Sequence, residues 1–182
     1  MSYTLKTYSK KILADTITPV SVYLKIRDKY PNSILLESSD YHANDNSFSY
    51  ICCNPIASIK VKDEKINKEF PDGSTEELDI DKNMDVTNEI DVFSKSFNVA
   101  DQDYKFITNG LFGFIAYDAV RYFEDIEISR KENSIEIPDI FYAVYKNVIA
   151  INHFKNEAYI FAHCFESENN IPEIERLLNV KS

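Results

Sequence analysis

The sequence is poor in glycine and cysteine and has no long apolar run. Its three glycines, Gly73, Gly110 and Gly113, do not form the closely spaced set of a P-loop or a dinucleotide-binding loop, so both motifs are excluded. Three cysteines, two of them adjacent, make a poor disulfide framework and favour a reducing, cytoplasmic setting. Because no run of about 18 apolar residues and no signal-peptide core occur, we expect neither a membrane span nor export.

Basic residues are also outnumbered. The chain of 182 residues has 20 Lys and Arg against 30 Asp and Glu, a net charge of −10. Nucleic acids and anionic membranes bind basic surfaces, so this balance disfavours both as partners. Residues 63–103 hold 13 acidic residues and 4 lysines, a net charge of −9 that leaves −1 for the rest of the chain. We interpret this acidic segment as a solvated face or a variable insertion.

Periodicity and turn residues predict an α+β fold in which antiparallel sheets pack with outer helices. A helix should begin at Thr18-Pro19, where Thr18 accepts from a free backbone N–H and Pro19 has its φ preset. Strands are expected on both sides of a turn at Asn54-Pro55, and a glycine within the apolar strand 109–117 indicates a close backbone approach. Further turns are expected at Pro71-Asp72-Gly73 and at 153–156. The predicted helices are 19–30, 87–97, 118–124 and 171–179, and the predicted strands are 5–15, 33–38, 47–53, 56–61, 109–117, 140–152 and 157–165.

The sequence gives little support for a metal site or for a catalytic nucleophile. His153, His163 and the cysteines lack the C-x2-C or H-x3-H spacing of a metal site, so no metal ligand is predicted. The run Ser38-Ser39-Asp40 with His42 has the residue types of a triad, but no G-x-S-x-G motif accompanies it. We therefore assign no catalytic residue to this chain.

Two polar constellations remain. The apolar run Ile34–Leu36 leads directly into Glu37-Ser38-Ser39-Asp40, which would present a carboxylate and hydroxyls to a small amphipathic ligand; a simple turn cluster is the alternative. Asp118, Arg121 and Glu124 are spaced three apart and predict an ion-pair ladder along a helix.

Taken together, several segments resemble the N-terminal region of the large subunit of anthranilate synthase, component I of the chorismate-utilising enzymes. They follow the family order along nearly the whole chain and are specific only as a set. The segments are TITPVSVYL (16–24), ILLES (34–38), NSFSYI (46–51), NPIA (54–57), NGLFGFIAYDAVRYFE (109–124), Ile137-Pro138-Asp139 and HFKNE (153–157).

The resemblance implies a function. Members of the family convert chorismate and an ammonia donor to anthranilate and pyruvate, the first committed step of L-tryptophan biosynthesis. They use Mg²⁺ and receive ammonia from a glutamine amidotransferase subunit, component II. Their chorismate and Mg²⁺ residues lie in the C-terminal two thirds of a much longer chain, a catalytic domain that this sequence lacks. Residues 1–182 then correspond to the N-terminal regulatory domain, a piece of a lyase that is inactive alone.

The resemblance also implies a site for L-tryptophan as feedback inhibitor. Carried over residue by residue, it places Ser38 as a polar contact to the effector and Glu37 nearest its ammonium group. An ungapped count places the other N-terminal contact at Phe48, beside Ser49. We expect the isolated chain to bind tryptophan weakly or not at all, because other walls of the pocket lie in the missing part. Strand edges and apolar faces left uncovered would favour self-association.

Two alternatives stay open. The large subunit of aminodeoxychorismate synthase, in the folate pathway, shares the same motifs and fold. From a different class, the chain would be a free-standing, non-catalytic domain that binds a small molecule. A stop codon directly after Ser182 would favour that second alternative.

Overall fold

The computed structural model describes residues 1–37, 47–82, 84–100, 102–124 and 137–179. They divide into two compact units. The first comprises Met1–Tyr3, Ile56–Phe97 and Leu111–Val144, and the second comprises Thr4–Pro55, Asn98–Gly110 and Tyr145–Ser182. The predicted triad-like run at 38–42 lies outside the described residues.

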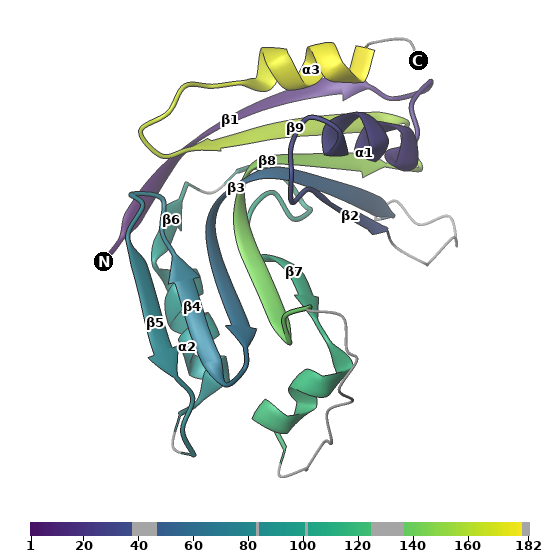
Figure 1. Ribbon diagram of the computed structural model, residues 1–182. Coiled ribbons are helices and arrows are strands. Elements are labelled where there is room, and N and C mark those ends of the chain that lie inside the picture. The colour runs from purple at the N-terminus through teal and green to yellow at the C-terminus, as the bar shows by residue number, and fades with distance from the viewer. Residues whose placement is uncertain (38–46, 83, 101, 125–136, 180–182) are drawn as a thin grey trace. The chain divides into compact units, whose positions relative to one another are not determined.

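The fold class is α+β, as predicted, and is mostly sheet (Figure 1). The strands are β1 (Tyr3–Leu13), β2 (Ile34–Glu37), β3 (Phe48–Lys62), β4 (Lys65–Glu69), β5 (Thr75–Asp79), β6 (Phe97–Val99), β7 (Phe112–Ile115), β8 (Ile140–Asn152) and β9 (Glu157–Cys164). The helices are α1 (Pro19–Arg27), α2 (Val86–Lys95) and α3 (Ile171–Asn179), with a 3-10 helix η1 (Tyr117–Tyr122). None of the helices in the described ranges is long and apolar enough to cross a membrane.

Hydrogen bonds join the strands in the order β5-β4-β3-β8-β9-β1-β6, with β2 added to β3 and β7 added to β8. Antiparallel register links β1 with β9, β2 with β3, β3 with β4, β4 with β5, β7 with β8 and β8 with β9. The long strands β3 and β8 each contribute one part to each unit.

The predicted turn at Asn54-Pro55 is wrong, because β3 runs through both residues. Asn54 takes a left-handed φ of 57°, which asparagine tolerates better than most residues. Its side-chain amide donates to the Oδ1 atom of Asn147, at 2.8 Å. One left-handed residue and one proline without an N–H interrupt the ladder locally without ending the strand.

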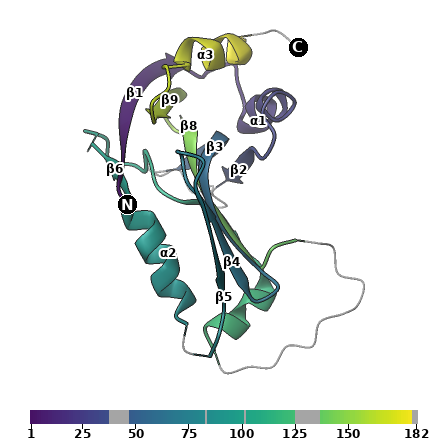
Figure 2. The same cartoon turned by 60° about the vertical axis from the view of Figure 1, so that its left-hand side comes forward.

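In the second unit, α1 and α3 lie over one face of the strands (Figure 2). The expected cap of α1 is confirmed: Thr18 Oγ1 accepts from the Ser21 N–H at 3.2 Å, and Ser21 Oγ accepts from the Thr18 N–H at 3.1 Å. The helix ends at Arg27, slightly before the predicted end. Beneath these helices lies the apolar core of the second unit, made of Ala14, Val22, Ile26, Ile51, Cys53, Ile149, Ile151, Ala158, Ile160, Ala162, Cys164, Ile171, Ile174 and Leu178.

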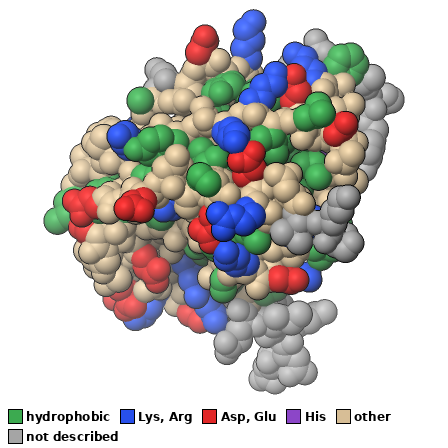
Figure 3. Space-filling view, turned by 90° about the horizontal axis from the view of Figure 1, so that it is seen from above, with side chains coloured by type: hydrophobic (Ala, Val, Ile, Leu, Met, Phe, Trp, Pro, Cys, Tyr) green, Lys and Arg blue, Asp and Glu red, His purple; other side chains and the backbone are tan. Residues whose placement is uncertain are grey.

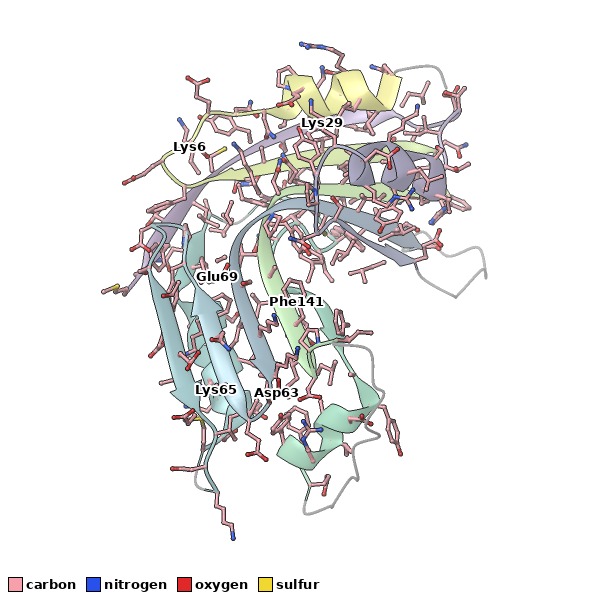
Figure 4. All side chains as sticks on the ribbon, viewed as in Figure 1. Lys6, Lys29, Asp63, Lys65, Glu69 and Phe141 are labelled. Atoms are coloured by element: carbon pink, nitrogen blue, oxygen red, sulfur yellow. The ribbon has the colours of Figure 1, made fainter. Side chains whose placement is uncertain are left out.

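Two ion pairs join α3 to other parts of this unit. Lys29, labelled in Figure 4, bonds Glu173 in the first turn of α3 at 2.6 Å, and Lys10 of β1 bonds Glu175 at 2.6 Å. Acidic and basic side chains are interspersed over the face that carries α3 (Figure 3). The described part of this face therefore carries charges of both signs, whereas a polyanion is attracted by a surface of positive charge.

In the first unit, the acidic segment forms the β4–β5 hairpin and α2. The predicted turn is confirmed at Gly73, which has a φ of 82° and donates its N–H to the Phe70 carbonyl at 2.9 Å. The ring of Phe93 packs 5.6 Å from that of Phe70 and 5.2 Å from that of Phe97. Phe97 was expected on the helix, but it begins β6, because α2 ends at Lys95.

A buried lysine joins this hairpin to α2. The side chain of Lys68 is only 4% exposed, and its ammonium bonds Glu76 of β5 at 2.9 Å and Glu89 of α2 at 2.7 Å. Burial opposes the charge, but the bonds to Glu89 and Glu76 outweigh it, so the pKa of Lys68 is raised. Lys68 thus links β4 to β5 and to α2 through ion pairs with two glutamates of the acidic segment.

The predicted ion-pair ladder at 118–124 is wrong. Arg121 sits on η1, and its guanidinium bonds the Asp139 carboxylate at 2.5 Å and the Tyr122 hydroxyl at 2.9 Å. Toward Asp118 it donates only to the backbone carbonyl, at 3.1 Å. Asp139 is largely buried, so a charge-assisted bond there is worth more than one to an exposed carboxylate.

The close approach expected in the apolar strand is confirmed at Gly113 of β7. A Cβ atom at this position would lie 1.9 Å from the carbonyl oxygen of Phe141, the β8 residue labelled in Figure 4. No side chain fits there, which explains why the strand carries a glycine in its interior.

Candidate functional site

The antiparallel pair β2 and β3 arranges the residues predicted to bind an effector. Glu37 pairs directly with Ser49, and two positions further Leu35 pairs with Ile51. Paired residues in an antiparallel sheet project to the same face, with Cβ atoms about 4.5–5.5 Å apart. Glu37 and Ser49 are thus neighbours on the face that also carries Ile51, a residue of the core beneath α1 and α3.

Phe48 does not share this face. Successive strand residues point to opposite sides, so Phe48 and Ser49 diverge. The ring of Phe48 stacks on Phe106 with centroids 4.6 Å apart, and Phe106 in turn packs 4.9 Å from Tyr159. Phe48 is only 9% exposed and belongs to this aromatic layer on the opposite face of the strands. Of the predicted contacts, the structure brings Glu37 and Ser49 together and separates Phe48; Ser38 lies outside the described residues.

The hydroxyl of Ser49 has a partner that the sequence did not suggest. Its Oγ lies 2.7 Å from Nε2 of His153, and the His153 N–H donates to the Ser47 carbonyl at 3.1 Å. Ser49 is 1% exposed, whereas His153 is exposed. A serine so deeply buried does not reach a substrate as a nucleophile, so we assign no catalytic dyad to this pair.

His153 is placed by the hairpin between β8 and β9, whose existence confirms the predicted connection at 153–156. Asn152 Oδ1 accepts from the N–H groups of Phe154 and Lys155 at 2.9 and 2.8 Å. Asn156 takes a φ of 51°, a conformation for which glycine is the usual residue. Sequence reasoning weighed His153 only as a metal ligand, because its contact with Ser49 depends on how β8 lies beside β3.

Together, Glu37, Ser49 and His153 form a polar row across adjacent strands. Glu37 comes from β2, Ser49 from the central strand β3, and His153 from the end of β8 on the other side of β3. The row presents a carboxylate, a hydroxyl and an imidazole in that order. A carboxylate accepts from an ammonium group and an imidazole can donate to a carboxylate, so the two exposed ends of the row, Glu37 and His153, suit a small zwitterion.

The other described histidine has both ring nitrogens engaged within the fold. Nε2 of His163 lies 2.9 Å from the Thr108 carbonyl, and Nδ1 lies 2.9 Å from Thr7 Oγ1. A carbonyl only accepts, so Nε2 carries the proton and Nδ1 accepts from the threonine hydroxyl. Burial lowers the pKa of His163, which keeps the ring neutral. The histidine ties β1, β9 and the segment at Thr108 together.

The three cysteines are buried and free. Burial raises the pKa of Cys53 to about 12 and that of Cys52 well above its usual value, so both are inert thiols. Across the described ranges, no three His, Cys, Asp or Glu residues are grouped so that they could hold a metal ion.

Comparison with known proteins identifies relatives. The sequence profile described as chorismate binding enzyme matches residues 32–181. Anthranilate synthase component 1 of Lactococcus lactis is 32% identical over 164 residues, which cover 84% of this chain and 31% of that protein. The same component of Thermus thermophilus is 28% identical over 165 residues, covering 87% and 32%. These relatives confirm the resemblance inferred from the motifs.

One solved structure is also similar. The crystal structure of anthranilate synthase component I from Streptococcus pneumoniae matches with a TM-score of 0.47 and 23% identity, over 93% of this chain and 35% of that one. The chain thus spans about a third of the length of the relatives that it matches, 31% of the Lactococcus lactis protein.

Proposed function

Because the chain belongs to the family of chorismate-binding enzymes, we propose that it is the N-terminal regulatory part of an anthranilate synthase component I. The complete enzyme would be a cytoplasmic lyase that converts chorismate and glutamine-derived ammonia to anthranilate and pyruvate. The relatives named anthranilate synthase component 1 support this assignment, and each is about three times as long as this chain. We propose that the catalytic domain and its Mg²⁺ site belong to the remaining part, and that residues 1–182 alone are inactive.

The role proposed for this chain is to bind L-tryptophan as a feedback inhibitor. The observation that carries it is the direct pairing of Glu37 with Ser49 at the end of the ILLES strand. The exposed Glu37 carboxylate would accept from the ammonium group of the effector, with Ser38 next to it along the chain as a second polar contact. Phe48 faces the other side of β3, so its part would be to support the strand from behind through its stacking on Phe106.

Partners follow from the same assignment. A glutamine amidotransferase subunit, component II, would supply ammonia to the complete enzyme. Exposed apolar side chains on and around β7 would favour self-association when this chain is isolated: Phe114 is 41% exposed, Ile115 48% and Tyr117 88%. Light scattering tests this, and a monodisperse monomer would contradict it.

An activity assay separates the candidate enzymes. The full-length gene product, supplied with chorismate, Mg²⁺, glutamine and its amidotransferase subunit, should release anthranilate and should lose activity when L-tryptophan is added. Formation of aminodeoxychorismate without tryptophan inhibition would instead identify the folate-pathway enzyme. A gene that stops directly after Ser182 would identify a free-standing binding domain.

A further inference from the structure

The residues expected to contact the effector lack a partner for one of its two charges. A zwitterionic α-amino acid brings an ammonium group and a carboxylate. Glu37 serves the ammonium, but the other predicted contacts, Ser38, Phe48 and Ser49, carry no positive charge. A carboxylate taken out of water needs strong donors, because an unpaired buried charge is costly.

The polar row supplies the missing donor. His153 stands on the opposite side of Ser49 from Glu37, because β3 lies between β2 and β8. Its Nε2 atom is held by Ser49 Oγ at 2.7 Å, and the ring is exposed. The backbone of His153 is itself fixed by the bond from its N–H to the Ser47 carbonyl at 3.1 Å. The ring is therefore anchored through Nε2 by a buried serine, and Nδ1 is the ring nitrogen that remains for a ligand.

We propose that His153 is the specificity residue for the effector's carboxylate in this site, and that Glu37 and His153 grip the two ends of an α-amino-acid zwitterion across Ser49. The inference rests on the function proposed above and deepens it. With Nε2 accepting from the Ser49 hydroxyl, Nδ1 carries the ring hydrogen and donates it to the carboxylate.

Three ligands that differ in one charge test the proposal on the full-length protein by isothermal titration calorimetry. L-Tryptophan carries both charges, tryptamine lacks the carboxylate, and indole-3-propionate lacks the ammonium group. For His153→Ala, the Kd of tryptophan should rise at least about tenfold while that of tryptamine stays unchanged. For Glu37→Gln, the Kd of tryptophan should rise and that of indole-3-propionate should stay unchanged.

Two further variants act as controls. Phe154→Ala alters an exposed neighbour in the same turn and should leave all three affinities as they are. His153→Gln supplies a side-chain amide as donor and should retain part of the tryptophan affinity that His153→Ala loses. A structural role for His153 would instead weaken all ligands together.

The possible failures are distinguishable. If tryptophan does not bind the unmodified protein, the proposed function fails, and this inference fails with it. If tryptophan binds but His153→Ala changes the affinities for tryptophan and tryptamine by the same factor, or changes neither, the effector site stands and the role of His153 is wrong.

Discussion

In the first unit, Gly113 lies where two strand backbones approach each other closely. At Gly113 an added Cβ would lie 1.9 Å from the Phe141 carbonyl oxygen, a backbone atom that does not swing away. Gly113→Ala should therefore lower the free energy of unfolding by about 3 kcal/mol, the upper range for overpacking. Gly73→Ala is the control, since its Cβ would meet open space and only the φ of 82° is strained. Urea unfolding would contradict this account if Gly113→Ala cost no more than Gly73→Ala.

His163 should make stability depend on pH. Burial lowers the pKa of His163 in the folded chain below the ordinary 6.5. As the pH falls, the unfolded chain therefore binds a proton at this residue before the folded chain does. This contribution is complete above pH 6.5 and is lost as the pH falls toward the folded value. Between pH 7.5 and 5.5 the native protein should lose up to about 1.4 kcal/mol more stability than His163→Gln, which corresponds to one pH unit below 6.5. Equal losses in urea titrations at the two pH values would refute the assignment.

At the scale of elements, hydrogen bonds from a buried asparagine, Asn147, connect α3 to the strands. Asn147 of β8 is fully buried, and its amide exchanges bonds of 2.8 and 2.9 Å with Asn170, whose carbonyl accepts from the N–H groups of Glu173 and Ile174 at the start of α3. Asn147 also accepts from Asn54 at 2.8 Å. The network thus reaches β3, β8 and α3.

Removal of one member leaves buried polar groups without partners. Asn147→Ala should cost about 3 kcal/mol in the free energy of unfolding. Asn170→Ala should cost less, and the double variant should be less destabilising than the two single effects combined, because both lose the same bonds. Additive effects in denaturant unfolding would show that the two amides act independently.

Local patterns were sufficient for most elements. The threonine cap of α1, the turn at Gly73 and the hairpin at 153–156 were all predicted, because each depends on residues a few positions apart. The failures involve distant partners. Asn54 continues a strand that its sequence would end, with its side chain held by Asn147, and Arg121 bonds Asp139, 18 residues away, in place of its helical neighbours.

The same distinction between local patterns and distant partners applies to the candidate site. The ILLES motif identified Glu37, and an ungapped count placed the second contact at Phe48, beside Ser49. The register of β2 against β3 pairs Glu37 with Ser49 and turns Phe48 to the other face. The contact between His153 and Ser49 depends on β8 lying beside β3. Neither is encoded in a local pattern, so sequence reasoning could name the contacts but could not sort them by face.

At the scale of the whole molecule, we propose that the effector site is incomplete in residues 1–182. The polar row offers groups for the two charges of tryptophan, but further walls for the indole ring would come from the remaining part of the enzyme. Calorimetry should therefore show weak or undetectable binding of L-tryptophan by this chain and tight binding by the full-length protein. Comparable micromolar binding by both would show that residues 1–182 form the whole site.

The most direct test of the central claim is the inhibition of the full-length enzyme by L-tryptophan before and after Ser38→Phe. A bulky ring on the residue that follows Glu37 in the chain should raise the tryptophan concentration needed for half-inhibition at least about tenfold, a loss of about 1.4 kcal/mol in binding. Turnover without tryptophan should stay unchanged, because the substitution lies outside the proposed catalytic domain. Unchanged inhibition would contradict the assignment of this chain as the effector-binding part.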